Sequence, residues 1–286
     1  MSTVRFSKFH GFGNDYIVVE KADMSAAPSI AEFAKAVCQR NTGAGSDGIA
    51  VLEKLDADAA DYFCEIINPD GSLAGFSGNG TRCAVAYLYH NNMWSAPTLR
   101  LQTKSGVKKF RLVNSTPEGH YVFEAEIGKP RFASDVIPFA TIADSTDVLD
   151  RKLSVNGEPY CVSCVNVGNP VACIFVEDFD FDWRSVGQSL EVHEAFPQKA
   201  NIVFVKVIDR SQIELRIWER AAGETSASGT CASGAAILSS YTGRTNREVS
   251  VRTVGGITTV VWRDDDEIVI TGNADFVYRG EWPIAA

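Results

Sequence analysis

The sequence predicts an α+β fold of two pseudo-symmetric domains, each a mostly antiparallel sheet wrapped around a central helix. Three observations predict it. Strand-like apolar runs outnumber helical patterns along the chain, and two of the helical segments are apolar on every face, which is typical of buried helices. The order of motifs also repeats at about half the chain length, which indicates two like domains. We place them at residues 1–122 plus 274–286 and at residues 123–273.

The repeat is clearest at two short polar motifs. SGNG from Ser77 leads into the apolar run TRCAVAYLYH, and SGTC from Ser228 leads into ASGAAILSS. Asn68 lies nine residues before the first motif and Glu219 nine before the second. Further upstream, GNDYIVV is echoed by GNPVACIFV. The shared order and offsets indicate that both motifs do the same job in their own half of the chain.

Each motif is expected at the N-terminus of a helix, because a small polar residue such as Ser77 or Ser228 caps the first free amides. Those amides have no partner inside the helix, and the aligned peptide dipoles add roughly half a positive charge. Two like domains across a pseudo-twofold axis would point both helix starts into one cleft. Such a cleft suits a carboxylate.

The other elements follow from periodicity and cap signals. A helix is expected at 29–40, with Ser29 as its cap, and another at 181–193. Strands are expected where β-branched and aromatic residues alternate or run together between turn residues. These ranges are 4–9, 16–20, 49–53, 64–68, 99–103, 108–113, 121–127, 161–167, 172–178, 201–207, 213–219, 248–254, 257–262 and 267–271.

Composition excludes several classes of function. The 286 residues are 45% apolar and 22% charged, which is ordinary for a globular protein. A formal charge of −9 argues against nucleic acid or an anionic membrane as the main partner. No segment is apolar enough to span a bilayer, and the first residues show no secretory signal. The seven cysteines form no regular framework, so a cytoplasmic location is expected.

Two apparent ligand-binding motifs are weak evidence for a metal site or a dinucleotide site. Cys161 and Cys164 form a lone CxxC within a strand pattern, where alternate side chains point opposite ways, and the four histidines are isolated, so we assign no metal. GAGSDG at 43–48 fits a dinucleotide pattern, but a helix precedes it and a strand follows, the reverse of what such a loop needs. A tight turn facing the substrate is expected there.

Six stretches together resemble the diaminopimelate epimerases, which belong to a superfamily of cofactor-free amino-acid racemases. They are KFHGFGNDY near the start, GAGSDG at 43, NPDGSLAGFSGNGTRC at 68, VNVGNP at 165, Asn201, and ERAAGETSASGT at 219. The resemblance implies the two-domain fold of that family with an active site in the interdomain cleft. It implies a reaction that removes a proton from one face of an α-carbon and returns one to the other, with no cofactor. It also implies a small amino-acid substrate, LL- or meso-diaminopimelate in lysine biosynthesis, and a homodimer.

The resemblance also assigns the site residues. It places the backbone amides of four residues around the carboxylate at the reacting carbon, where fixed dipoles stabilise developing charge. A second set would grip the distant amino-acid end of the substrate, with an Arg fork on the carboxylate and Glu and Asn groups on the ammonium. The amides are those of Gly78, Asn79, Gly229 and Thr230, and the second set is Asn14, Asn68, Asn169, Asn201, Glu219 and Arg220.

The sequence departs from the family at the two catalytic positions, where relatives carry cysteine and this chain has Ser77 and Ser228. A cysteine thiolate is accessible near neutral pH at a helix N-terminus, whereas a serine hydroxyl is rarely ionised. The sequence shows no partner base beside either serine, so we expect a form of low activity. Relatives also carry His where Val171 stands and Gly where Cys231 stands.

Three explanations of the serines stay open at this stage. They are a Cys-to-Ser replacement that traps a ligand, a natural branch with altered substrate or with isomerase or lyase chemistry, and a displaced base at Cys231. Cys231 lies three residues after Ser228, so in a first helical turn it can approach the cap side chain. A rival of another class is a catalytically silent protein that still binds an amino acid.

Overall fold

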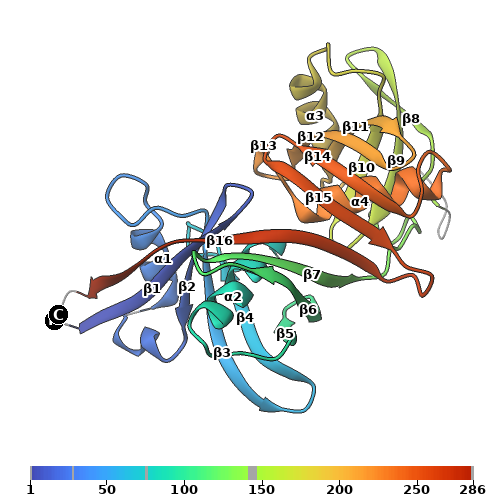
Figure 1. Ribbon diagram of the computed structural model, residues 1–286. Coiled ribbons are helices and arrows are strands. Elements are labelled where there is room, and N and C mark those ends of the chain that lie inside the picture. The colour runs from blue at the N-terminus through green and yellow to red at the C-terminus, as the bar shows by residue number, and fades with distance from the viewer. Residues whose placement is uncertain (1, 28, 75–76, 141–146, 285–286) are drawn as a thin grey trace. The chain divides into compact units, whose positions relative to one another are not determined.

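The computed structural model describes residues 2–27, 29–74, 77–140 and 147–284 (Figure 1). The chain divides into two compact units. Unit 1 is Met1–Ala125 with Thr271–Ala286, and unit 2 is Glu126–Ile270. The sequence analysis placed the domain boundaries between residues 122 and 123 and between residues 273 and 274. That each unit is a separate domain stays a prediction.

The first half of the chain forms most of unit 1. Its elements are β1 (Ser2–Gly11), β2 (Asn14–Glu20), the 3-10 turn η1 (Asp23–Ala26), α1 (Ile30–Val37), β3 (Ile49–Ala57), β4 (Ala60–Ile67), α2 (Gly78–His90), β5 (Thr98–Thr103), β6 (Gly106–Ser115) and β7 (His120–Gly128). The last residues of β7 belong to unit 2.

The second half repeats this order with two additional strands, β8 and β13. Its elements are β8 (Arg151–Val155), β9 (Glu158–Asn166), β10 (Pro170–Phe175), α3 (Trp183–Glu191), β11 (Asn201–Asp209), β12 (Gln212–Glu219), β13 (Gly223–Thr225), α4 (Gly229–Tyr241), β14 (Glu248–Thr253), β15 (Gly256–Trp262) and β16 (Ile268–Ile284). From its fourth residue onward, β16 belongs to unit 1.

Strand pairing confirms the internal repeat. β1 pairs antiparallel with β2 as β9 does with β10, and β2 pairs parallel with β3 as β10 does with β11. β3 and β4 are antiparallel, like β11 and β12, and β4 pairs parallel with β5 as β12 does with β14. Parallel neighbours need a crossover connection, and the four α-helices supply these connections. Antiparallel pairs predominate, as predicted.

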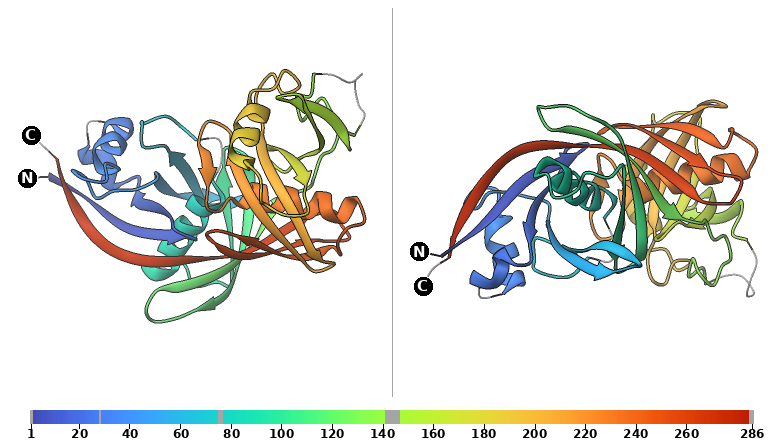
Figure 2. Two further views of the ribbon diagram at one scale, coloured as in Figure 1. Left: turned by 90° about the horizontal axis from the view of Figure 1, so that it is seen from above. Right: turned by 60° about the horizontal axis from the view of Figure 1, so that its bottom comes forward.

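The strands of unit 1 close into a ring. The order runs from β1 to β7, then to β16, and β16 also pairs antiparallel with β1. The α2 helix packs against β1, β2, β3 and β4 within this unit (Figure 2). Its residues from Asn79 to Leu88 are all buried, which confirms the prediction of a central helix.

The α4 helix has the same role in unit 2. Its residues from Thr230 to Ser239 are buried, and it packs against β9, β10 and β11. Glycine allows the close approach, because a Cβ at Gly234 would lie 2.8 Å from Val171. Val171 is therefore core packing beneath the helix.

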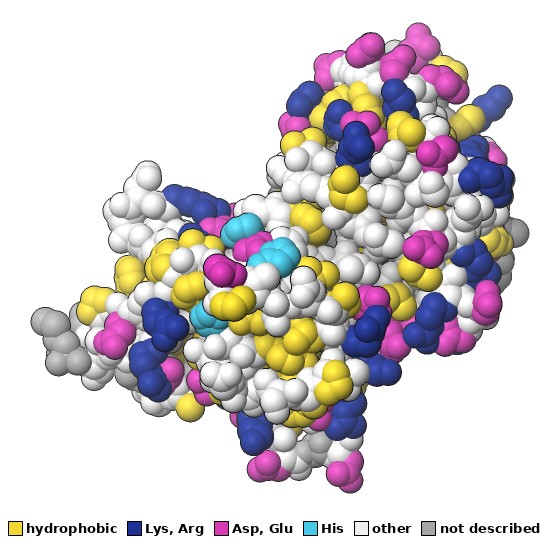
Figure 3. All heavy atoms as spheres, in the orientation of Figure 1, with side chains coloured by type: hydrophobic (Ala, Val, Ile, Leu, Met, Phe, Trp, Pro, Cys, Tyr) yellow, Lys and Arg dark blue, Asp and Glu magenta, His cyan; other side chains and the backbone are white. Residues whose placement is uncertain are grey.

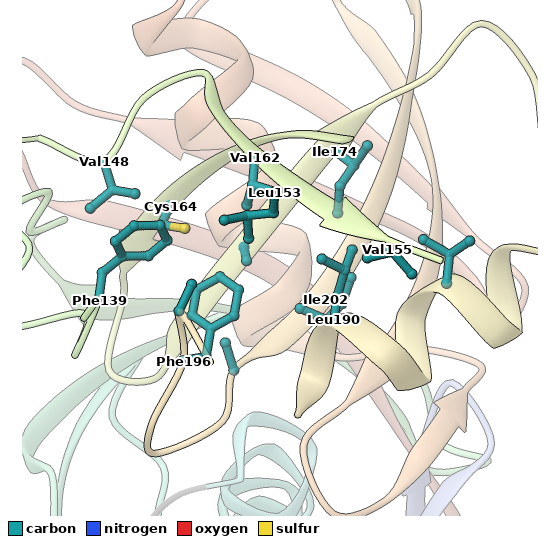
Figure 4. Packing of buried hydrophobic residues seen from close by; sticks show 14 of the residues in the cluster. Phe139, Val148, Leu153, Val155, Val162, Cys164, Ile174, Leu190, Phe196 and Ile202 are labelled. Atoms are coloured by element: carbon teal, nitrogen blue, oxygen red, sulfur yellow. The ribbon is translucent and has the colours of Figure 1, made fainter. Parts of the chain in front are cut away.

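A second layer in unit 2 lies between the sheet and α3. Leu190 of α3, Ile202 of β11 and Phe196 belong to one buried cluster with Phe139 and Leu153 (Figure 4). In unit 1, α1 packs Phe33 and Val37 into an equivalent cluster with β1, β2 and β3. Burial of these apolar side chains holds α3 and α1 against their sheets.

The cap predicted for α1 is confirmed. Ser29 Oγ accepts a hydrogen bond from the Glu32 amide at 3.1 Å, and its hydroxyl donates to the Glu32 carboxylate at 3.1 Å. Glu32 occupies the N3 position of a capping box, but its carboxylate accepts from the Ser29 hydroxyl and not from the Ser29 amide. The helix ends at Val37, three residues before the predicted Arg40.

The structure differs from the predicted elements mainly at strands that have weak local sequence signals. Prediction missed η1, β8 and the three-residue β13, and it ended the last strand at residue 271, whereas β16 continues to Ile284. That additional stretch contains Gly, Asn, Asp and Pro, which are poor strand formers, and it is held by pairing with β1.

No helix within the described ranges is long and apolar enough to cross a membrane. On the face drawn in Figure 3, acidic and basic side chains are interspersed and form no large field of one sign.

Candidate functional site

The first half of the candidate site is the start of α2 in unit 1. Ser77 is the N-cap residue, and its Oγ accepts a hydrogen bond from the Gly80 amide at 3.0 Å. The hydroxyls of Tyr16 and Ser77 are also hydrogen bonded, at 2.9 Å. The predicted cap is thus confirmed. The amides of Gly78 and Asn79 lie in the first turn, where helix geometry leaves N–H groups available to an anion.

A chain of hydrogen bonds orients the side chains beside this helix start. Asn79 Nδ2 donates to Asn14 Oδ1 at 3.1 Å, and Asn14 Nδ2 donates to Asp47 Oδ2 at 2.7 Å. Asp47 belongs to the 43–48 turn and also receives a hydrogen bond from Arg40. The structure therefore brings together two predicted binding residues, Asn14 and Asn79, and the turn holds one of them in place.

The turn itself is anchored by ion pairs around Asp15. Lys8 lies 2.7 Å and Arg40 2.8 Å from its carboxylate. Burial acts to raise the pKa of Asp15, but the hydrogen bonds and charges of Arg40 and Lys8 outweigh it, and the pKa is lowered. An ionised carboxylate therefore anchors the turn at neutral pH.

Arg82 is a cation buried one turn inside α2, and 1% of its surface is exposed. Its guanidinium donates to Asn79 Oδ1 and to the Asn273 carbonyl, and neither of these is a carboxylate. Burial lowers the pKa of Arg82 to about 10, so it stays charged at neutral pH. This charge adds to the positive end of the helix dipole and favours an anion at the first turn.

The second half of the site is the start of α4 in unit 2. Ser228 has the extended backbone of an N-cap residue, but within the described chain its side chain makes no cap hydrogen bond. Instead Ser228 Oγ donates to Glu219 Oε2 at 2.8 Å. The amides of Gly229 and Thr230 lie in the first turn beside it.

Glu219, the last residue of β12, is a strong base candidate. Burial raises its pKa, and the hydrogen bond from Ser228 acts in the opposite direction without cancelling the rise. The sequence analysis found no partner base beside either serine, and for Ser228 this was wrong. The nine-residue offset between the two residues was visible in the sequence, but only the return of α4 to the end of β12 brings them into contact.

Asn201 and Arg220 also lie together in unit 2. Asn201 Oδ1 accepts from the Arg220 amide at 2.9 Å, and Asn201 Nδ2 donates to the Pro170 carbonyl at 3.3 Å. The Arg220 side chain is exposed and donates to the Gln198 carbonyl at 3.3 Å. No carboxylate pairs with it among the described residues. Asn201 thus links the start of β10 to the residue that follows β12, and the Arg220 guanidinium is available for a ligand.

Two other residues predicted to bind the substrate make few or no side-chain hydrogen bonds within the described ranges. Asn169, beside Pro170, has no side-chain hydrogen bond to any residue in the described ranges. Asn68 follows β4, and its Nδ2 donates to Ser72 Oγ at 3.0 Å within a turn. Among the described residues, no hydrogen bond joins Asn68 to Ser77 or Asn14, and its role in binding stays a prediction.

Glu191 is a positioning residue that the sequence analysis missed. Its carboxylate accepts from the Ala221 amide at 3.0 Å and from Trp218 Nε1 at 2.9 Å, and it pairs with Lys199 at 3.1 Å. Burial acts to raise the pKa of Glu191, but these donors outweigh it and lower the pKa. The ionised carboxylate fixes the turn that carries Glu219 and Arg220. A single Glu at a helix end gives no sequence signal for this role.

The displaced-base hypothesis for Cys231 is not supported by its surroundings. Its exposed fraction is 0%, and burial, assisted by the nearby Glu219 charge, raises the pKa of the thiol well above the usual value. A thiol in that state stays protonated at neutral pH.

Cys231→Ala is therefore expected to leave the rate of α-proton exchange within about twofold of the unsubstituted protein, because a buried protonated thiol supplies no base. Exchange followed by NMR in deuterated buffer measures this. A loss of about 100-fold or more with an unchanged melting temperature would identify Cys231 as the base after all.

The CxxC motif that the sequence analysis set aside as a metal site has the alternating burial expected of a strand. Cys161 is exposed and Cys164 is buried on β9. No group of three or more His, Cys, Asp or Glu side chains in the described part of the chain could hold a metal ion.

Comparisons with known proteins identify the family that the sequence matches. The sequence model of the family described as diaminopimelate epimerase matches residues 6–133 and 163–277. The chain is similar to the diaminopimelate epimerase of Moorella thermoacetica, with 36% identity over 285 residues that cover 98% of this chain and 100% of the relative. It is also similar to that of Methanococcus maripaludis strain C6, with 34% identity covering 97% and 99% of the two chains.

Solved structures of lower sequence identity share the fold. A hydroxyproline epimerase from Agrobacterium vitis, with bound trans-4-hydroxy-L-proline, matches with a TM-score of 0.71 and 15% identity over 98% of this chain and 92% of that chain. A phenazine biosynthesis protein of the PhzF family from Bacillus anthracis matches with a TM-score of 0.66 and 16% identity over 99% and 100%. These likenesses show that the chain shares its α+β fold with these proteins.

Proposed function

This chain belongs to the diaminopimelate epimerase family, and we propose that it is a cofactor-independent epimerase that interconverts LL- and meso-diaminopimelate for lysine biosynthesis. One observation carries the proposal in spite of the missing cysteines. The Ser228 hydroxyl lies 2.8 Å from the half-buried Glu219 carboxylate, whose pKa is raised, at the start of a buried helix. That arrangement supplies a base where a serine alone would not.

The substrate would be held at both ends. The first-turn amides of α2, and equally those of α4, would offer N–H groups to the carboxylate at the reacting carbon and would stabilise the negative charge that develops as the α-proton leaves. Arg220 would bind the distal carboxylate through its planar fork. Two half-sites of one design suit the two faces of a single α-carbon, which is the arrangement an epimerase needs.

Proton abstraction would use Glu219 through Ser228. As Ser228 Oγ takes the α-proton, its own proton moves to Glu219 Oε2, so no free alkoxide accumulates. A carboxyl group whose pKa is raised by burial is a stronger base than an ordinary glutamate.

The decisive test is α-proton exchange. Incubation of LL- or meso-diaminopimelate with the protein in deuterated buffer should place deuterium at the α-carbon and produce the other epimer, as seen by NMR and chiral chromatography. The control is the doubly substituted protein with Ser77→Cys and Ser228→Cys, which should exchange faster because thiolates form near neutral pH. If neither form exchanges either substrate, the protein is not this epimerase.

A second candidate function is favoured by the serines themselves. A protein that keeps the amino-acid site but has lost the thiol pair would bind without turnover. Calorimetry that detects tight binding of diaminopimelate, together with absent exchange, would identify this silent binding protein. Product formed without inversion would instead identify a lyase or isomerase.

A homodimer and a cytoplasmic location belong to the proposal and rest on the family resemblance.

A further inference from the structure

Arg82 takes no part in the proposed proton transfer, and we infer that it is a positioning residue for Asn14. Its guanidinium sets the direction of the Asn79 side-chain amide, and Asn79 sets that of Asn14. All three residues lie in unit 1. This role rests on the proposed function, in which Asn14 binds the substrate, and it deepens that function by naming what fixes the donor and the acceptor of the Asn14 side chain.

The hydrogen bonds from Arg82 to Asp47 run in one direction. An asparagine side chain accepts at Oδ1 and donates at Nδ2, whereas a guanidinium only donates. Arg82 donates to Asn79 Oδ1, so Asn79 Nδ2 is turned toward Asn14 and donates to its Oδ1 at 3.1 Å. Asn14 Nδ2 then donates to Asp47 Oδ2 at 2.7 Å. In this amide relay of Arg82, Asn79, Asn14 and Asp47, the donor at one end and the acceptor at the other favour the same orientation of both amides.

Asp47 ends the amide relay in the 43–48 turn, and both of its carboxylate oxygens accept hydrogen bonds. Oδ2 also accepts from the Asp15 amide at 3.1 Å, and Oδ1 accepts from Arg40 at 2.6 Å. The Asp47 amide donates back to the Asp15 carboxylate at 3.1 Å. If the Asn14 side chain were turned over, its Oδ1 would face a carboxylate oxygen, and neither atom could donate. The 43–48 turn thus supplies the acceptor that holds Asn14 in one orientation.

Arg82 is held at the other end of the relay by close packing. Its Nε donates to a second acceptor, the Asn273 carbonyl, at 3.2 Å. A Cβ at Gly272 would lie 2.7 Å from Arg82 Cζ and one at Gly11 would lie 3.5 Å from Nη2, so the guanidinium uses the space that these glycines leave. The cation lies over the Phe12 ring, with 5.6 Å between Cζ and the ring centroid. Phe12 has a φ of +56°, which a bulky residue rarely adopts, and such backbone strain is typical of functional sites.

The cost of burying this cation argues against a role in packing alone. Arg82 is 1% exposed, and the acceptors of its hydrogen bonds are amide oxygens. A buried charge without a carboxylate partner is costly, and an apolar side chain of similar volume could fill the same space. A group that donates and cannot accept fixes the direction of Asn79. Glutamine in its place could meet Asn79 with either end of its amide and would leave both orientations open.

The orientation matters because Asn14 has hydrogen-bonding capacity left for a ligand. Beyond the relay, its Oδ1 can accept one more hydrogen bond and its Nδ2 can donate one more. In the fixed orientation, these are an acceptor beside Asn79 and a donor beside Asp47. A ligand with an ammonium and a carboxylate distinguishes them, since the ammonium needs an acceptor and the carboxylate needs a donor. Loss of the orientation should therefore weaken binding and leave the proposed base, Glu219, unaltered.

Asn79→Ala separates the relay from the charge of Arg82, because it keeps the cation and the backbone amide at position 79 and removes only the side-chain amide. It should weaken binding of diaminopimelate about tenfold, the effect of one hydrogen bond, as measured by calorimetry. Arg82→Gln should cause a similar loss. In protein that already carries Asn14→Ala, either substitution should change the affinity by less than about twofold, because the residue on which both act is gone.

The ligand-free protein gives a second readout. In an NMR spectrum of protein with isotope-labelled asparagine, the Asn14 side-chain amide signal is identified by its loss in Asn14→Ala. Asn79→Ala and Arg82→Gln should both move this signal, although in the described chain no hydrogen bond joins Arg82 to Asn14 directly. Arg100→Gln is the matched control, since it removes a cation of unit 1 that pairs with Asp61 at 2.8 Å. It should move neither the signal nor the affinity.

A charge role, a structural role and a failed function give different results. If Arg82→Gln weakens binding as much in Asn14→Ala protein as in the unsubstituted protein, Arg82 acts through its charge and the relay is rejected. If Asn79→Ala and Arg82→Gln both leave the Asn14 signal in place, Arg82 does not orient Asn14. Should Arg82→Gln fail to fold, Asn79→Ala decides by the same two measurements. If the unsubstituted protein binds no diaminopimelate, the proposed function fails, and the Asn14 signal still decides the relay.

Discussion

Glu219→Gln is expected to lower the rate of α-proton exchange by about 10²–10⁴-fold, the contribution typical of a general base. Glutamine keeps the shape of the side chain and can still accept the Ser228 hydrogen bond, but it cannot take a proton. The measurement is deuterium incorporation into diaminopimelate by NMR. An exchange rate that stays within a few-fold of the unsubstituted protein would reject Glu219 as the base.

The pH profile gives an independent check. A base must be ionised, so exchange should rise with pH through the pKa of Glu219, which burial holds above the usual glutamate range, and fall away below it. Because that pKa is raised in the fold, ionisation of Glu219 costs stability as pH rises through it. Glu219→Gln should therefore not lower the melting temperature at neutral pH.

Glu224→Gln is the matched control for this variant. Glu224 lies five residues further along, on β13, and forms an exposed ion pair with Arg184 at 2.6 Å. Exposed pairs of this kind contribute little to stability. The control should leave both the exchange rate and its pH profile unchanged.

Arg220→Ala is expected to weaken binding of diaminopimelate about 100-fold or more, because the distal carboxylate loses a bidentate, charge-assisted partner. The Asn201 side chain and the Gln198 carbonyl hold Arg220 in place, and its guanidinium pairs with no carboxylate in the described chain. Arg220→Lys should give an intermediate loss, since the charge stays and the planar fork is removed. Calorimetric dissociation constants measure both effects.

The specificity of this effect can be tested with the ligand and with a second arginine. An amino acid of the same length without the distal amino-acid group should bind the unsubstituted protein and Arg220→Ala equally. Arg216→Ala, which removes a cation already paired with Glu214 at 2.9 Å, should leave diaminopimelate binding unchanged. Equal affinity of the unsubstituted protein and Arg220→Ala for diaminopimelate would place the distal carboxylate elsewhere.

Local signals account for what could be predicted of the fold. A cap residue acts on amides within three or four positions, so the starts of α1 and α2 follow from Ser29 and Ser77. Ser228 marks the start of α4 by position, but its side chain donates to Glu219 and does not cap the helix. Apolar residues on every face predicted two buried helices, and the repeat predicted two like halves. The far half of β16 could not be predicted, because its pairing with β1 joins residues from opposite ends of the chain.

The sequence by itself determined the duplicated halves, the two helix starts and the family, and the set of site residues that it assigns stays a prediction. Only the tertiary structure decided how the serines could work. Tyr16 reaches Ser77 across 61 positions, and Glu219 meets Ser228 only because α4 begins beside the end of β12. The physical reason is the distance along the chain over which each interaction acts. Caps and dipoles act within a turn of helix, whereas burial and long-range contacts, which raise the pKa of Glu219 and bury the thiol of Cys231, exist only once the sheet has closed around each helix.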